Sequence, residues 1–358
     1  MNTIPYRLPP EDPGRGFHAG ERLLQASIGV AEELAPIGQR VIRDHMPEQH
    51  QAFFAQQPFI VLGAADATGQ PWATVLAGPP GFVHAPTPQR LRVAALPQAG
   101  DPLQGAIRPG LRIGLLGIQP ATRRRNRLNG VVTAVDDGGF ELAVLESFGN
   151  CPKYIQGREV AYLGAGLADV QAEVPAGAAT GPAWLDAPDA AARQLIAAAD
   201  TLFIASRHPG EDAALAYGAD ASHRGGAPGF VRLSFAADGT AALLLPDYAG
   251  NRFFNTFGNL LLEPRVGLVF VSPGAPAGLL HVAGRAEILS VEGEPVLPAA
   301  VHSSAPAASA GSAPMPLNAF PGAERLLRIV ITAVRHRPRA LSLDWPAASL
   351  PSPFLPAV

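Results

Sequence analysis

The sequence has little of what builds disulfides, membrane spans or strongly charged surfaces. Its 358 residues include one cysteine, Cys151, so no intramolecular disulfide can form. Charged residues, glycine or proline interrupt each apolar run before it reaches about 18 residues, which argues against a transmembrane helix. The formal net charge of −3 provides no basic field that would attract nucleic acid or an anionic membrane, so we expect neither partner.

Targeting signals and common catalytic motifs are missing too. Residues 1–21 have no apolar core of the signal-peptide kind, which together with the single cysteine predicts a cytoplasmic protein. Neither a G-x-S-x-G nor a P-loop pattern occurs, which disfavours the commonest hydrolases and nucleotide triphosphatases. Residues 163–169 (LGAGLAD) have only two of the three glycines of a dinucleotide-binding turn. His45 and His50 are five residues apart and would not share a helix face, so no metal site is expected.

The sequence does contain a short helical region followed by many short β-type segments. Apolar residues recur at helical spacing over 20–56, where Pro36 and Pro47 are expected to separate two or three helices. Glycine (38) and proline (37) are abundant, which favours a turn-rich β architecture. The expected strands of the first half are FIVLGAA (59–65), PWATVLAG (71–78), LRVAAL (91–96), LRIGLLGI (111–118), GVVTAV (130–135) and FELAVLE (140–146).

The second half repeats this texture. The expected elements are a linker (171–190), a helix (191–200), a first strand (201–206), a low-complexity surface loop (297–316) and a last strand with its exit (328–345). The basic stretch RHRPRA (335–340) falls in that exit, and we expect its side chains to be solvated.

The two halves can be aligned with each other. The matches are PPGFV (79–83) with APGFV (227–231), LRVAALPQAG (91–100) with AALLLPDYAG (241–250), and RPGLRIGLLGI (108–118) with EPRVGLVFV (263–271). The offset between matched residues changes by only a few positions along the chain, which short loop insertions explain. The pattern predicts an internal duplication.

Two polar clusters in the second half lie beside expected strand and helix ends. Ser222 and Arg224 precede a strand, and Asn251 and Arg252 occupy the turn before the helical pattern RFFNTFGNLLL (252–262). Arginine meets a phosphate with a planar fork of donors, and the free N–H groups of a helix start add donors and a favourable dipole. These residues therefore indicate a phosphate pocket. On the residues alone, a capped helix with solvated arginines stays open as the alternative.

Four stretches also carry a resemblance to a known family: SHRGGAPGFVRL (222–233), PDYAGNRFFNTFGNLLLEPRVGLVF (246–270), RRRNRLNGVV (123–132) and SFGNCPKYIQ (147–156). They resemble the pyridoxamine 5′-phosphate oxidase-like FMN-binding split-barrel superfamily, in particular its flavin-nucleotide-binding branch. The likeness covers most of residues 40–345. It implies two six-stranded split barrels with FMN in the groove between them. It also implies that the FMN phosphate is held by Ser222, Arg224, Asn251 and Arg252.

The expected fold is therefore mainly β with accessory helices, arranged as tandem duplicated FMN-binding split barrels behind an N-terminal helical extension. The expected segments are the helical extension (1–56), the first split barrel (57–165), a linker and helix (166–195), the second split barrel (196–345) and a C-terminal tail (346–358).

The polar residues of the two halves are complementary. The first half has AGDPLQG (99–105) where the second has AGNRFFN (249–255), so the first lacks the arginine-bearing turn. It has instead TRRRNRLNG (122–130) and FGNCPKY (148–154), which the second lacks. We therefore predict one composite FMN site per chain. To it the first half contributes Arg123, Arg125, Asn126, Asn150 and Lys153.

Alternation along a strand supports that prediction. Alternate residues of a strand face the same side, so Arg123, Arg125 and Arg127 are expected to lie side by side. Three like charges on one face need a nearby anion or open water. Cys151 is interpreted as a packed thiol, since no activating base can be placed beside it.

These features predict an FMN-dependent oxidoreductase without an assigned catalytic residue. A flavin performs hydride or electron transfer itself, so the protein need only bind, orient and tune it. Positive residues such as Arg123 or Lys153 would stabilise the reduced anionic form of the ring. The electron donor is expected to be a small molecule or a protein, because one cysteine cannot hold an iron–sulfur cluster. A homodimer is compatible with the site but not required by it.

Two alternatives stay open. One is a non-catalytic flavin-binding or carrier module of the same fold. The other is a barrel pair that binds haem or a deazaflavin, with His208 or His281 as a haem ligand, although a packed or surface histidine is the plainer interpretation of either residue.

Overall fold

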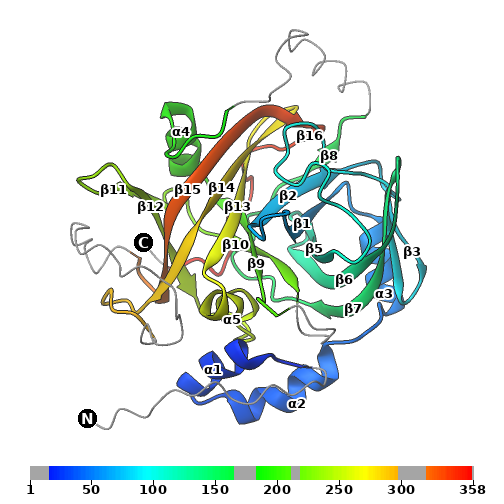
Figure 1. Ribbon diagram of the computed structural model, residues 1–358, viewed down its shortest axis with the longest axis horizontal. Helices are drawn as coiled ribbons and strands as arrows, with labels where there is room; N and C mark the ends of the chain where they lie inside the picture. The colour runs from blue at the N-terminus through cyan, green and yellow to red at the C-terminus, as the bar shows by residue number, and fades with distance from the viewer. Residues whose placement is uncertain (1–15, 165–182, 211–217, 297–319, 357–358) are drawn as a thin grey trace.

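Two seven-stranded antiparallel sheets form most of the chain. The computed structural model describes residues 16–164, 183–210, 218–296 and 320–356. The two sheets lie side by side, and the first two helices lie together at one end of the molecule (Figure 1). The mainly β fold expected from the sequence is confirmed, but each sheet has seven strands where the resemblance implies six.

Three helices precede the first sheet, namely α1 (Ala19–Ser27), α2 (Ala31–Val41) and α3 (Glu48–Ala55). Their number agrees with the expected two or three, and Pro47 is the N-cap of α3. The expectation that Pro36 ends a helix is wrong, because this residue lies inside α2. The break between the first two helices lies earlier in the sequence, at Gly29. Its φ of 74° is a left-handed conformation that glycine adopts without steric cost.

The first sheet contains every strand expected in the first half, and one more. Its strands are β1 (Phe59–Ala65), β2 (Pro71–Ala77), β3 (Val83–Thr87), β4 (Arg90–Val93), β5 (Arg112–Gln119), β6 (Arg124–Asp136) and β7 (Gly139–Gly149). They are hydrogen-bonded in the order β2-β1-β5-β6-β7-β4-β3. No apolar pattern in the sequence predicts β3, because its five residues include Pro86 and are mostly exposed at the sheet edge.

The second sheet has the same strand order. Its strands are β9 (Thr201–Arg207), β10 (Ala219–Gly225), β11 (Arg232–Phe235), β12 (Ala241–Tyr248), β13 (Arg265–Ser272), β14 (Ala277–Leu289) and β15 (Ala323–Leu341). The order β10-β9-β13-β14-β15-β12-β11 repeats that of the first sheet strand for strand. Both sheets are therefore built to one plan.

The remaining elements are α4 (Ala190–Ala198), α5 (Asn255–Leu262) and a two-stranded ladder of β8 (Ala161–Tyr162) and β16 (Leu343–Asp344). The helix expected at 191–200 is thus present as α4. Most of the linker expected at 171–190, and all of the loop expected at 297–316, lie outside the described residues.

The basic stretch 335–340 is not a solvated exit, contrary to expectation. It lies within β15, where Arg337 is 7% exposed and forms an ion pair with Asp101 at 3.1 Å. The guanidinium of Arg335 lies 4.2 Å from the centre of the Trp184 ring. The sequence does not show these partners, because they come from other parts of the chain.

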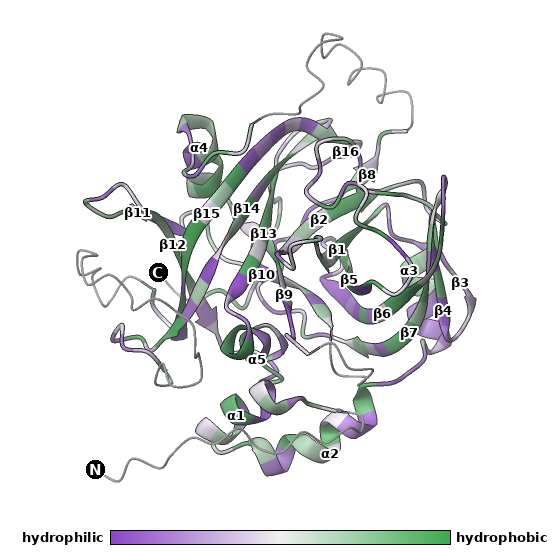
Figure 2. Ribbon diagram, in the orientation of Figure 1, coloured by the Kyte–Doolittle hydropathy of each residue, from purple (hydrophilic) through white to green (hydrophobic). Residues whose placement is uncertain are grey.

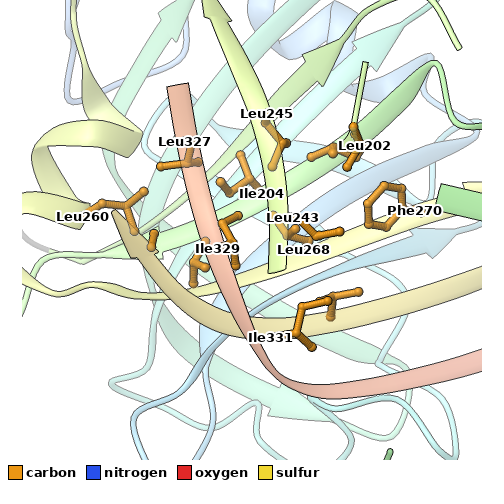
Figure 3. Close-up of a cluster of buried hydrophobic side chains, with 14 of the residues drawn as sticks. Leu202, Ile204, Leu243, Leu245, Leu260, Leu268, Phe270, Leu327, Ile329 and Ile331 are labelled. Carbon is orange, nitrogen blue, oxygen red and sulfur yellow. The ribbon is translucent and has the colours of Figure 1, made fainter. Parts of the chain in front are cut away.

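Alternation along the strands separates an inner core from the contact between the sheets. On β9, Leu202 and Ile204 point into the core of the second sheet, where Figure 3 shows them among side chains of other strands. Their neighbours Phe203 and Ala205 point the other way and pack in a cluster shared by both sheets. Because successive strand residues face opposite sides, one strand serves two cores.

Glycines allow the two sheets to approach closely. A Cβ atom on Gly114 of β5 would lie 2.5 Å from the carbonyl oxygen of Ala219 in β10. At the matching place, a Cβ atom on Gly267 of β13 would lie 2.3 Å from the carbonyl oxygen of Pro71 in β2. Since both neighbours are backbone atoms, any side chain at these glycines would force the sheets apart.

We predict that Gly267→Ala destabilises the protein. The added methyl group would meet the backbone of Pro71 and Trp72, and forcing extra atoms into a packed core costs typically about 1–3 kcal/mol. Urea unfolding should show a loss of unfolding free energy in this range. Gly149→Ala is the control, because its Cβ would touch only the Asn126 carboxamide oxygen, at 3.7 Å. Equal stability of Gly267→Ala and the unaltered protein would contradict the close packing.

Candidate anion-binding site

A polar pocket lies where segments of both halves converge. The first half supplies the start of β6 and the segment after β7; the second supplies β10, the loop between β12 and α5, and the start of β15. The hydrophilic colouring of parts of β6 and β10 is visible in Figure 2. Seven of the nine residues predicted to bind a cofactor line this pocket, namely Arg125, Asn150, Lys153, Ser222, Arg224, Asn251 and Arg252.

The enclosed part of the pocket is small. Its volume is about 110 Å³. Sites that surround a whole small-molecule ligand usually enclose roughly 300–1,000 Å³. The enclosed part therefore suits one charged group of a larger ligand.

Positive charge dominates the lining. Its cationic residues are Arg125, Arg127, Lys153, Arg224, Arg252 and Arg325. The acidic residues of the lining, Asp247 and Glu324, both pair with Arg325, at 3.0 and 2.9 Å. Among the described residues, the other cations except Arg127 form no ion pair. Such an arrangement attracts an anion from outside the chain.

The guanidinium groups are also crowded and desolvated. Burial lowers the pKa of Arg125 to about 10, and the nearby charges of Arg127 and Arg224 act in the same direction. Burial likewise lowers the pKa of Arg224. An anion placed among these groups would offset both effects, because it compensates the charges that burial and mutual repulsion destabilise.

The Ser222 hydroxyl is prepared to donate a hydrogen bond. Its oxygen accepts from a guanidinium nitrogen of Arg127 and from the Thr256 hydroxyl, at 3.0 Å for the latter. A hydroxyl oxygen has two acceptor positions, so both are used. The Ser222 proton is then free for an acceptor in the pocket.

The start of α5 adds backbone donors. Asn255, Thr256 and Phe257 of its first turn line the pocket, and its N-cap, Phe254, has no capping side chain. The first N–H groups of a helix have no partner within the helix, and the helix dipole favours negative charge there. Arg252 and Phe254 both have a φ of 61°, a costly conformation for residues other than glycine. The loop is therefore held in an unusual shape at the pocket.

Several polar atoms at the pocket have no hydrogen-bond partner. Within the described part of the chain, Arg127 Nε, His223 Nε2 and Asn150 Oδ1 are buried and unpaired. The guanidinium of Arg224 contacts the Phe257 ring, at 5.3 Å from its centre, but forms no hydrogen bond with a described residue. Since buried polar groups normally have partners, the unpaired donor on Arg127 points to a ligand with acceptor atoms.

The structure places the other two predicted residues elsewhere. Arg123 lies in the turn before β6 with a φ of 56°, and its guanidinium donates to the carbonyl oxygens of Ile155, Leu350 and Pro351. The expected shared face thus holds for Arg125 and Arg127 but not for Arg123. Asn126 is buried next to Arg125 in β6 but does not line the pocket, as alternation along a strand requires.

Several pocket residues were not predicted from the sequence. Arg325 lies on β15, and Tyr154 donates its hydroxyl proton to the carbonyl oxygen of Ala249 at 2.9 Å. Lys153 Nζ lies 3.4 Å from the same oxygen, so the first half holds the loop of the second. Because alternate residues of a strand share a face, a pocket position for Arg125 in β6 predicts the same for Arg127, whereas no sequence pattern predicts Arg325.

The histidines considered as haem ligands lie outside this pocket. His281 is fully buried, with Nε2 at 3.3 Å from the Thr74 hydroxyl oxygen. His208 is buried, and its ring centre is 4.9 Å from that of His18. Among the described residues, no group of three or more His, Cys, Asp or Glu is placed to hold a metal ion. No described helix is long and apolar enough to cross a membrane.

Comparisons with known proteins add little. No model of a known protein family matches the sequence, and no curated protein matches it. One solved structure matches 42% of this chain and 92% of its own at 18% identity, with a TM-score of 0.21. A TM-score this low carries no argument about the fold.

A group of buried carboxylates lies directly behind Arg127. Asp220 Oδ1 lies 3.3 Å from Arg127 Nη1 and accepts from Asn129 Nδ2 at 2.8 Å, and Asn129 also donates to Glu146 at 2.9 Å. Burial raises the pKa of Glu146 to about 8, and the charge of Asp220 adds to this shift. Glu146 therefore keeps its proton at neutral pH.

We predict that Glu146 makes stability depend on pH. The unfolded chain releases this proton near pH 4.5 and the folded protein near pH 8, so the unfolding free energy should fall as pH rises between these values. Glu146→Gln has no proton to lose and should reduce that fall by on the order of 3 kcal/mol between pH 5 and 8. Urea unfolding across this range tests the effect, with the exposed Glu292→Gln as control. An unchanged slope in Glu146→Gln would contradict it.

Proposed function

We propose that the chain binds FMN in the composite pocket and acts as a flavin-dependent oxidoreductase of the pyridoxamine 5′-phosphate oxidase-like family. The observation that carries this proposal is the pocket itself, where cations from both halves surround a phosphate-sized space and donors are unpaired. The resemblance in the sequence supplies the identity of the ligand. The geometry supports an anion in the place where the resemblance expects the FMN phosphate.

The identical strand order of the two sheets supports the finer proposal about the fold. We infer that the sheets are tandem split barrels that arose by internal duplication. The pairing of two such units within one chain makes the composite pocket possible, since each half supplies only some of the cations that line the pocket. The proposed stoichiometry is one FMN per chain.

The residues present fit the phosphate of FMN. Arg224 and Arg252 would supply guanidinium donors, Ser222 its free hydroxyl proton, and the first turn of α5 its backbone N–H groups. Arg125 and Lys153 of the first half line the same pocket and would add positive charge. The donor set matches a doubly charged anion that accepts several hydrogen bonds.

The chain's own contribution to the chemistry is electrostatic. When bound, FMN supplies hydride or electron transfer. The arginines of the pocket would hold the phosphate, and Lys153 would stabilise negative charge that develops on the ligand. The proposal therefore needs no acid–base pair. A small molecule or a protein would deliver the electrons.

We predict that Arg224→Ala weakens FMN binding without unfolding the protein. Hydrogen bonds to charged groups contribute about 1.5–3 kcal/mol, so the affinity should fall by roughly 10- to 100-fold. Titration followed by flavin absorbance gives the affinity, and circular dichroism reports the fold. The control is Arg108→Ala, an exposed arginine that donates to the Ala106 carbonyl oxygen and does not line the pocket.

The absorbance spectrum of the purified protein tests the ligand itself. A flavin spectrum with about one FMN released per chain on heating is the expected result if FMN binds in the cation-rich pocket described above. A colourless protein that also fails to bind added FMN would refute the proposal. FMN bound as tightly by Arg224→Ala as by the unaltered protein would refute the phosphate role of the pocket.

A kinetic experiment separates an enzyme from a flavin carrier. With an electron acceptor such as ferricyanide supplied, the FMN-loaded protein should oxidise a reduced nicotinamide or another donor over many turnovers, because the pocket cations stabilise the reduced ligand. Lys153→Met should lower the rate while FMN stays bound. Anaerobic stopped-flow absorbance follows the reduction of the flavin by the donor, steady-state reduction of the added acceptor follows turnover, and Arg108→Ala serves again as control. A loaded protein that turns over no donor would favour the carrier.

A further inference from the structure

The common plan of the two sheets defines a second position that corresponds to the pocket. Thr74 is the fourth residue of β2, as Ser222 is of β10. His281 corresponds to Arg127 through the strand ladders. Arg127 pairs with Leu116 of β5, and His281 pairs with Val269 of β13, the strands that occupy the same place in the two sheets.

The same contact recurs at both positions. In the pocket, Arg127 donates to the Ser222 hydroxyl. At the second position, Nε2 of His281 lies 3.3 Å from the Thr74 hydroxyl oxygen. In each case a basic residue of one sheet meets a hydroxyl of the other. The two positions thus share their geometry, although their residues differ.

The turns that approach these hydroxyls also correspond. AGDP (99–102) aligns with AGNR (249–252), so Asp101 takes the place of Asn251. Asp101 Oδ1 accepts from the backbone N–H of Leu103 at 3.0 Å, and Asn251 Oδ1 accepts from that of Phe253 at 3.2 Å. One oxygen of each side chain is therefore used in the same way.

Asp101 and Asn251 differ at the second terminal atom of the side chain. Asp101 Oδ2 accepts from the Thr74 hydroxyl at 2.5 Å and from Arg337 Nη1 at 3.1 Å, and it lies 3.6 Å from His281 Nε2. Asp101 and Arg337 are 6% and 7% exposed, so this carboxylate is a buried anion among donors. At the corresponding atom Asn251 has an amide NH₂ group, which is itself a donor.

At the second position a carboxylate of the turn therefore meets the hydroxyl and the cation directly, whereas the carboxylates that line the pocket, Asp247 and Glu324, pair with Arg325. Thr74 gives its proton to the Asp101 carboxylate, whereas the described neighbours of the Ser222 hydroxyl are the Arg127 guanidinium and the Thr256 hydroxyl, with no carboxylate. Arg337 is paired with a carboxylate, whereas Arg224 and Arg252 are not. A buried cation needs a counter-ion, and Arg337 has one in Asp101.

We propose that Asp101 closes a second anion-binding position of this fold by supplying the carboxylate that a ligand would otherwise provide. The ligand at the first position rests on the proposed function, whereas the closure by Asp101 rests on its own contacts. The chain is thereby limited to one anionic ligand. Removal of the carboxylate should uncover a site for a small carboxylate or for phosphate, built from Thr74, His281 and Arg337.

Asp101→Ala tests the proposal, with formate as the probe because formate replaces the group removed. Loss of a buried charge partner should lower the unfolding temperature by on the order of 10 °C. Formate should restore at least about half of this loss in a saturable way, as expected when a ligand binds the folded state, whereas chloride at equal ionic strength should not. Asp101→Asn is the matched control, because its amide fills the space and leaves no room for formate.

The outcome decides the proposal in each case. A formate response in Asp101→Ala that exceeds that of Asp101→Asn and of the unaltered protein supports it, and equal responses overturn it. If Asp101→Ala does not fold in chloride, its refolding yield in formate against chloride gives the same comparison. Failure of the unaltered protein to bind FMN would remove the proposed function but would leave this comparison intact.

The reciprocal variant tests the correspondence of the two positions. Asn251→Asp places a carboxylate where the ligand's anion is proposed to bind, so its affinity for inorganic phosphate should fall at least about tenfold. Isothermal titration against the unaltered protein measures this change. Phosphate bound by the unaltered protein and equally well by Asn251→Asp would overturn the correspondence.

Discussion

The close contact between the two sheets is the constraint on which the pocket depends. At Gly114 and Gly267 the backbones of the sheets come so near that a Cβ atom would not fit. This proximity brings β6 of one sheet within hydrogen-bond reach of β10 of the other, so that Arg127 meets Ser222 and Asp220. The polar pocket is therefore a product of the packing between the sheets.

The distribution of charge around that contact follows from the cost of burying ions. A buried guanidinium is stable only with a counter-ion or with hydrogen-bond acceptors. The counter-ions differ between the second position and the pocket. Arg337 has the carboxylate of Asp101, and Arg325 has those of Asp247 and Glu324. Of the remaining cations, Arg127 pairs with Asp220, and Arg125 and Lys153 contact backbone carbonyl oxygens. Among the described residues, Arg224 and Arg252 form no ion pair, and this is why an anionic ligand is expected there.

Ligand binding and stability are coupled in such a site. The pKa values of Arg125 and Arg224 are lowered by burial and by neighbouring positive charge, so the pocket without an anion carries an electrostatic cost. The left-handed residues of the loop before α5 add a conformational cost at the same place. An anion that binds only the folded state offsets these costs and raises the stability of the whole protein.

Local patterns in the sequence determined the element types and much of the site. The alternation of apolar residues predicted six strands of the first half and the first strand of the second, and helical spacing predicted the N-terminal helices and α4. Seven of the nine proposed binding residues lie in one pocket, and most of them stand near a strand end or in a turn, where a polar residue is a local signal of a binding site. Strand β3 was not predicted, because an edge strand with exposed residues and a proline leaves no apolar pattern.

Only the tertiary structure decided which of these residues meet. Arg123 follows the same alternation as Arg125, but a left-handed turn directs it to the C-terminal segment instead. Arg325 and the pairing of Arg337 with Asp101 join residues that are distant in the sequence. Their contacts depend on the packing of one sheet against the other, and no local pattern of residues encodes that packing.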